Sequence, residues 1–282
     1  MVWGPAGDVV IVPRERSPKI DRTGAIRQVI DDVRLNKVPA VTLAFWIAKI
    51  AATTLGETGG DAVSMSMNFG YLAATGIFAA VFVVALVLQV AERRYRPFNY
   101  WFVIVATTTV GTTISDYLDR TAGLGYPLTS LILFGMVLAC LGAWRLTTGS
   151  LSVARVADYK TEIFYWTTIL ASNTLGTALG DYLADSRGFG FEGGALVFGG
   201  LIGVVVAAYF ATRISHTILF WAAFILTRPL GATLGDILTK PQIQGGLNLD
   251  RVESSLTLAA FMTVCIVATN LRKPAPTGAM AH

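Results

Sequence analysis

The chain has 282 residues, of which 54% are hydrophobic and only 14% are charged, and its mean hydropathy is +0.59. A soluble domain usually has about 25% charged residues, so this composition excludes an ordinary soluble protein and is typical of an integral membrane protein. The net charge of +4 does not indicate a nucleic-acid partner, because the basic residues gather in alternate loops between apolar segments.

The N-terminal arm, residues 1–37, is polar and basic, and we expect it to be cytoplasmic. Residues 21–36 fit either a short amphipathic helix, with Ile26, Val29, Ile30 and Val33 at helical spacing, or a solvated arm. No apolar region typical of a signal peptide precedes residue 38.

Eight apolar stretches follow the arm, and together they predict a single transmembrane domain over residues 38–271. A helix of about 20 apolar residues crosses the hydrocarbon core with all its backbone groups paired. The predicted spans are 38–56, 70–91, 98–117, 126–147, 163–182, 192–212, 214–237 and 253–271. Residues 272–282 are predicted to form a disordered cytoplasmic tail.

One unit recurs four times along these spans: a Trp, a Gly ten residues later, an Asp five residues further on, and a Gly nine residues after that. The copies are Trp46–Gly56–Asp61–Gly70, Trp101–Gly111–Asp116–Gly125, Trp166–Gly176–Asp181–Gly190 and Trp221–Gly231–Asp236–Gly245. The corresponding repeats cover residues 38–93, 94–150, 160–213 and 214–271. Because each has two spans, all four enter the membrane in the same direction. We therefore expect an all-α, pseudo-fourfold bundle of eight transmembrane helices built from parallel repeats.

The distribution of basic residues predicts the orientation of the bundle. Most Lys and Arg residues lie in the arm and in the loops after even-numbered spans, whereas the opposite loops hold only Arg120, Arg187, Lys240 and Arg251. The positive-inside rule then places both termini in the cytoplasm, and we expect a multi-pass protein of a bacterial inner membrane.

The first helix of each repeat has a polar stripe. At 100° per residue, positions 7, 11 and 15 after each Trp share one face with it. The polar occupants are Thr53, Thr108, Asn173 and Arg228 at position 7, Glu57, Thr112 and Thr177 at position 11, and the four Asp at position 15. A polar stripe should face the bundle interior rather than lipid, and the Gly residues beside it should let helices pack closely.

Asp61, Asp116, Asp181 and Asp236, together with Glu57 one turn inward of Asp61, are the candidate metal ligands. Four converging carboxylates cannot all stay ionised without cations or donors nearby. Carboxylate and hydroxyl oxygens suit a hard divalent cation, and proton exchange at Glu57 is compatible with the same site. The plainer interpretation is that the Asp residues bond backbone groups at helix ends or are exposed in outer loops.

Lys49 and Arg228 are bases within the spans, where an unpaired charge costs about 2.5–3.5 kcal/mol. We expect Lys49 to pair with Glu57, and Arg228 to pair with an inner carboxylate. The alternative is that they replace a cation in the resting state or bind an anionic substrate. The Gly59–Gly60 pair and Pro229 are further candidates for local unwinding of their helices, which would free backbone carbonyls as ligands.

The characteristic residues Trp46, Trp101, Trp166 and Trp221 lie near the cytoplasmic ends of their helices. They fit either an interfacial aromatic belt or a ring that closes the inner end of a central path. Four Trp-bearing two-span units in tandem resemble a bacterial family of integral membrane proteins that is described as four such repeats. The resemblance covers about residues 38–271 and implies eight spans, but it implies no activity.

These patterns predict a membrane transporter for a cation, most simply a divalent metal as substrate, with lipid and the transported ion as partners and no resident cofactor. The substrate path would include Lys49, Thr53, Thr108, Thr112, Asn173, Thr177, Arg228 and the four Trp residues. A permease for a small organic, anionic solute is the alternative, and a non-transporting structural or sensory protein is a further one. We expect no enzyme activity, because His is scarce and no nucleophile is paired with a base.

Overall fold

The computed structural model describes residues 2–3, 9–10, 37–92, 94–153, 156 and 158–271. The chain divides into two compact units, residues 1–34 and residues 35–282. In the first unit, β1 (Val2–Trp3) pairs in antiparallel fashion with β2 (Val9–Val10). The segment 21–36 and the tail 272–282, for which a helix and disorder were considered, lie outside the described residues.

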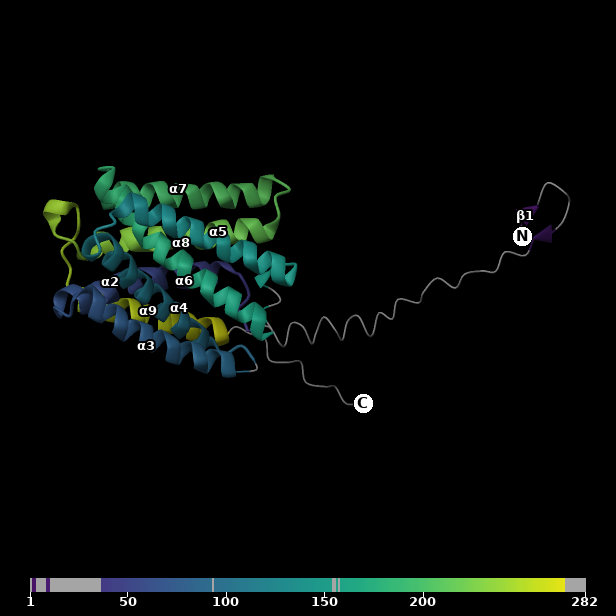
Figure 1. The fold of residues 1–282 in the computed structure, drawn as a ribbon, viewed down its shortest axis with the longest axis horizontal. Helices are drawn as coiled ribbons and strands as arrows, with labels where there is room; N and C mark the ends of the chain where they lie inside the picture. The colour runs from purple at the N-terminus through teal and green to yellow at the C-terminus, as the bar shows by residue number, and fades with distance from the viewer. Residues whose placement is uncertain are drawn as a thin grey trace. The chain divides into compact units, whose positions relative to one another are not determined.

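The described part of the second unit contains eight long α-helices, which lie alongside one another in Figure 1. They are α2 (Leu43–Asp61), α3 (Gly70–Ala91), α4 (Pro97–Asp116), α5 (Tyr126–Thr148), α6 (Tyr159–Asp181), α7 (Gly190–Ala211), α8 (His216–Thr239) and α9 (Arg251–Leu271). Short turns join some of them: η1 (Ala62–Ser66), η2 (Tyr117–Thr121), η4 (Tyr182–Ser186) and η5 (Gln242–Gln244).

Capping residues set two helix starts that hydropathy alone places wrongly. The backbone N–H of Phe45 donates to the Thr42 hydroxyl at 3.4 Å, so α2 begins at residue 43 and not at residue 38. The backbone N–H of Thr161 donates to Asp158 at 3.0 Å, so α6 begins at residue 159 and not at residue 163. Oxygen-bearing side chains are favoured at these positions because they satisfy the unpaired N–H groups of the first helical turn.

The second Gly of the motif adopts a left-handed conformation in every repeat. Its φ angle is +74° at Gly70, +73° at Gly125, +68° at Gly190 and +85° at Gly245. A Cβ atom disfavours this region, so Gly is the residue that such a turn requires. This explains why the motif keeps a Gly where the chain turns toward the second helix.

The first helices of the repeats form a closed ring. Helix α2 contacts α4, α4 contacts α6, α6 contacts α8, and α8 contacts α2. Outside the ring, α3 packs on α4, α5 on α6, α7 on α8, and α9 on α2. The second helix of each repeat therefore covers the first helix of the next repeat, and the last helix covers the first.

Burial separates the two kinds of helix. Five helices, α3, α5, α7, α8 and α9, are long and apolar enough to cross a membrane. Within the most apolar window of α8, 67% of the residues are buried, compared with 11% in α3 and in α7. The outer helices expose large apolar side chains such as Leu72, Leu196 and Val204. This surface suits a hydrocarbon environment, and the membrane character follows from it.

The inner helices stay continuous where local unwinding was expected. Helix α2 runs through Gly59 and Gly60 to residue 61, and α8 runs through Pro229 to residue 239. A Cβ atom at Gly60 would lie 3.1 Å from Thr112 Cγ2, so the neighbouring helix packs directly on the glycine. Close packing in the ring thus supports the helical backbone, and the expected unwinding is wrong.

Candidate functional site

The four motif Asp residues are buried at one end of the ring, with 1–2% of each exposed. Two of them share a guanidinium. Arg120 Nε lies 3.3 Å from Asp116 Oδ1, and Arg120 Nη2 lies 3.2 Å from Asp181 Oδ2. These carboxylates are neither exposed in loops nor confined to capping their own helices.

The other two Asp residues share an ammonium group. Lys240 Nζ lies 3.0 Å from Asp61 Oδ2 and 3.1 Å from Asp236 Oδ1, and Arg251 Nε lies 3.7 Å from Asp61 Oδ2. Arg120 and Lys240 occupy the same position, four residues after the Asp of their own repeat. Each bridges this Asp to the Asp of the following repeat, so the two bridges occupy equivalent positions in the two halves of the chain.

The four Asp carboxylates outnumber the two cations that bridge them, Arg120 and Lys240. A third base, Arg251, approaches only Asp61. Burial alone would lower the pKa of Lys240, but the carboxylates of Asp236, Asp61 and Asp181 raise it above its usual range. Lys240 therefore keeps its positive charge at neutral pH. With all four Asp ionised, this layer still favours a further cation or protons.

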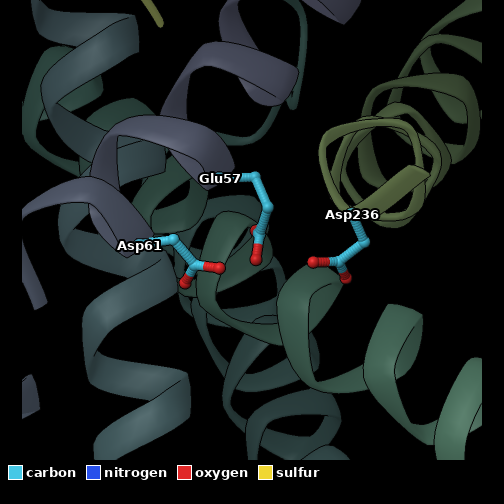
Figure 2. Close-up of side chains that lie close together, drawn as sticks. All are labelled: Glu57, Asp61 and Asp236. Atoms are coloured by element: carbon cyan, nitrogen blue, oxygen red, sulfur yellow. The ribbon is translucent and has the colours of Figure 1, made fainter. Parts of the chain in front are cut away.

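Three of the five predicted metal ligands come together. One carboxylate oxygen from each of Glu57, Asp61 and Asp236 lies within 4.8 Å of the other two, and all three residues are buried. In Figure 2, Glu57 and Asp61 extend from α2 and Asp236 extends from α8, with the carboxylates turned toward one another. Asp116 and Asp181 do not join this group, because Arg120 holds them together on the other side of the ring.

Arg228 connects all four inner helices about one helical turn from the Asp residues, toward the aromatic end of the ring. Its Nη2 lies 3.0 Å from Glu57 Oε2, donates to Thr177 Oγ1 at 2.6 Å and also donates to Thr112 Oγ1. These acceptors occupy position 11 after the Trp in the first three repeats, and the fourth repeat has the small, buried Ala232 there. The expected pairing of Arg228 with a carboxylate is confirmed, and the partner is Glu57.

The expected Lys49–Glu57 ion pair is wrong, because Arg228 takes the carboxylate. Lys49 Nζ instead donates to Asn173 Oδ1 at 3.3 Å and lies 4.1 Å from the centre of the Phe224 ring. Asn173 Nδ2 donates in turn to Thr107 Oγ1 at 3.0 Å. A neutral amide thus faces the ammonium where a carboxylate was expected.

The Thr residues at position 7 lie between helices. Thr108 Oγ1 is 2.8 Å from the carbonyl of Val105 in its own helix and 3.1 Å from that of Ala52 in the neighbouring helix. Thr53 Oγ1 is likewise 2.8 Å from the carbonyl of Ile50 and 3.2 Å from that of Thr227. Both Thr side chains are fully buried. They hold neighbouring helices together, and their hydrogens are already committed to backbone carbonyls.

The four motif Asp residues form one layer across the ring, here called the Asp layer. Aromatic side chains fill the opposite end of the ring. Trp101, Trp166 and Trp221 are buried there and Trp46 is half-buried. The aromatic residue before each Trp packs on the Trp of the next repeat, with ring centres 5.6 Å apart for Phe45–Trp101, 5.6 Å for Tyr100–Trp166, 6.3 Å for Tyr165–Trp221 and 5.7 Å for Phe220–Trp46. This burial favours a closing ring over an exposed interfacial belt.

A cavity of about 390 Å³ lies at the end of the ring where the motif Asp residues are buried. Its lining includes the two bridging cations. The lining residues are Arg120, Ala184, Asp185, Gly190, Phe191, Lys240 and Gln244. A solute in this cavity would meet the cations first and the carboxylates behind them.

Sequence reasoning missed Arg120 and Lys240 as site residues, and it also missed the four aromatic residues that precede the Trp residues. The signals were present in the repeat alignment. A base stands four residues after the Asp in the second and fourth repeats, and a Phe or Tyr precedes the motif Trp of every repeat. Both bases were counted only as loop charges.

A model of the family described as "Repeat of Unknown Function (DUF347)" matches the chain four times, at residues 44–95, 99–150, 164–215 and 219–273. These stretches correspond to the four Trp-bearing repeats. A comparison with curated proteins found no match, and neither did a comparison with solved structures.

Proposed function

The chain belongs to the DUF347 repeat family, and from this premise we propose that it is an eight-span, pseudo-fourfold membrane transporter for a divalent cation. Three inner helices, α2, α4 and α6, fall short of the hydropathy of a typical span. They have 19, 20 and 23 residues, which is close to the length that a bilayer requires. Their polar residues face the ring interior, so the outer helices supply the lipid contact.

The observation that carries this proposal is the group of Glu57, Asp61 and Asp236 beside a cavity that contains Lys240 in its lining. Three buried carboxylates within 4.8 Å of one another offer the oxygen ligands that hard divalent cations prefer. Burying three carboxylates is costly because it removes charges from water, and a bound cation would offset that cost.

Lys240 acts in this proposal as a tethered cation that occupies the site between transport events. Its ammonium group bridges two of the three carboxylates, where it supplies one of the charges that a metal ion would supply. Entry of a divalent cation through the cavity would displace Lys240 toward the outer side. The aromatic ring and Arg228 close the opposite side in this state.

The surplus of basic residues at the aromatic end supports a bacterial inner-membrane location with both termini in the cytoplasm. The cavity and the Asp layer then face the periplasm. Protons released or taken up by the carboxylates would provide a coupling ion for export or uptake.

The test measures the thermal stability of the purified protein against Mn²⁺ at constant ionic strength. A ligand that binds only the folded state stabilises it by about 2.7 kcal/mol at a concentration of one hundred times Kd. We expect a saturable rise in Tm for the unmutated protein, a rise at lower Mn²⁺ concentration for Lys240→Gln, and no rise for Asp61→Asn. The Lys240→Gln protein should also carry more Mn²⁺ across liposome membranes than Asp61→Asn does.

Arg120→Gln is the matched control, because Arg120 bridges the other two Asp residues in the same way. That pair has no acid at position 11 of its own repeats, where Thr112 and Thr177 stand. Removing Arg120 should therefore create no strong Mn²⁺ site of its own. If neither the unmutated protein nor Lys240→Gln responds to Mn²⁺, Mg²⁺ or Zn²⁺, the cation proposal is wrong.

A further inference from the structure

Two buried bases lie in the middle of the ring, and a single carboxylate, Glu57, is available to balance their two charges. Lys49 and Arg228 are both 0% exposed, and Glu57 forms an ion pair with Arg228 alone. In the described part of the chain, Lys49 forms no ion pair with a carboxylate. With both bases protonated, one positive charge in this region is uncompensated, which is costly in a low-dielectric interior.

Arg228 also has donors that meet no acceptor. Its ion pair and its two Thr hydrogen bonds all use Nη2, whereas Nε and Nη1 are buried and have no hydrogen-bond partner among the described residues. Guanidinium and ammonium groups only donate, so an acceptor must meet them. Buried donors are almost always paired, and an orphaned one indicates a bound water or ion.

The side chains around Lys49 supply no negative charge. Asn173 turns its oxygen to Lys49 and its nitrogen to Thr107, so its two ends are both engaged. The Phe224 ring lies 4.1 Å from Nζ, a contact that favours the charged ammonium. The charge of Lys49 is therefore supported locally but not balanced.

We propose that Lys49 and an unpaired N–H group of Arg228 bind a small monovalent anion, such as chloride or formate, on the inner side of Glu57. One negative charge balances the second of the two bases, and the anion accepts one of the orphaned N–H groups of Arg228. The ligand must be small, because Lys49 and Arg228 are both 0% exposed. This site adjoins the proposed cation site through the Arg228–Glu57 ion pair and has the opposite charge preference.

The experiment follows Tm of the purified full-length protein in EDTA while sodium gluconate is replaced by sodium chloride at fixed ionic strength, and again by sodium formate. The sodium concentration stays constant and no divalent metal is present, so the result does not depend on the cation proposal. We expect a saturable rise in Tm with chloride or formate. Lys49→Met should lose this rise and should melt at a higher temperature than the unmutated protein in gluconate.

Lys37→Met is the matched control, because Lys37 is also buried but has a carboxylate partner, Glu162, at 2.7 Å. It should melt at a lower temperature and keep the full response to the anion. The proposal is overturned if the unmutated protein does not respond to either anion, or if Lys49→Met keeps the response. Stabilisation by raised pH without any effect of anions also overturns it, because Lys49 would then lose its charge by deprotonation.

Discussion

At the residue scale, the first Gly of the motif makes room for a side chain of the neighbouring inner helix. A Cβ atom at Gly56 would lie 2.1 Å from Thr108 Oγ1, and one at Gly231 would lie 2.0 Å from Thr53 Oγ1. Thr53 and Thr108 stand seven residues after the Trp of the following repeat in the ring. The spacing of Trp and Gly is therefore a packing rule between neighbouring repeats, in keeping with small residues at helix interfaces.

This packing rule predicts the effect of Gly176→Ala. An added methyl group would lie 2.3 Å from Arg228 Cγ and 2.5 Å from Arg228 Cβ, so the helices must separate or Arg228 must move away from Glu57. We expect the free energy of unfolding to fall by about 1–3 kcal/mol, the usual cost of overpacking. Denaturation of the purified variant measures the change.

Gly199→Ala on the outer helix α7 is the control for this variant. No atom lies within 4 Å of a Cβ built at Gly199, and Ala is the better helix former by about 1 kcal/mol. Its stability should be unchanged or slightly raised. Equal loss of stability in both variants would contradict the packing rule.

The interior position of the acidic residues could be predicted from helical periodicity, because Asp61, Asp116, Asp181 and Asp236 share a stripe with other polar residues. The basic residues that pair with these carboxylates could not be predicted in this way. Lys240 reaches Asp61 across 179 positions of the sequence, and no local pattern specifies such a contact. The competition between Lys49 and Arg228 for Glu57 depends in the same way on which helices are neighbours in the ring.

At the scale of elements, the sequence predicts four two-helix units but not their pairing. The second helix of each unit is strongly apolar overall, so its composition does not reveal which inner helix it covers. The structure pairs it with the next repeat, and α9 consequently closes the ring against α2. This closure joins the two ends of the membrane domain and leaves no inner helix without an outer partner.

Ring closure predicts that a disulfide can form between α2 and α9. Ser255 Oγ donates to Thr58 Oγ1 at 2.8 Å, so the two side chains are close enough for a disulfide. In a protein whose Cys140 and Cys265 are replaced by Ala, Thr58→Cys with Ser255→Cys should oxidise readily. We expect it to stabilise the fold by about 2–4 kcal/mol, as measured by electrophoretic mobility and by Tm before and after reduction.

Thr58→Cys with Thr263→Cys is the matched pair that should not react. Thr263 lies eight residues further along α9, which is about 12 Å along the helix axis, and its side chain is exposed. Equal crosslinking of both pairs would mean that α9 does not hold the position that closes the ring.

At the scale of the whole molecule, polar groups form layers along the ring. A cavity adjoins the Asp layer, Arg228 and Lys49 follow, and the aromatic rings close the other end. The cavity approaches these polar groups from the Asp end of the ring. Which side of the membrane the cavity faces decides whether Lys240 meets solutes from outside or from inside the cell.

The positive-inside rule predicts that the cavity end faces outward, and the labelling of single cysteines tests this orientation. Ile243 lies in η5 beside the cavity and is 94% exposed, and Ser150 is exposed in a loop at the aromatic end. In a protein without Cys140 and Cys265, a membrane-impermeant thiol reagent should label Ile243→Cys in intact cells. It should label Ser150→Cys only after the membrane is permeabilised. The reverse pattern would invert the topology, and the tethered Lys240 would then control entry of a cation from the cytoplasm.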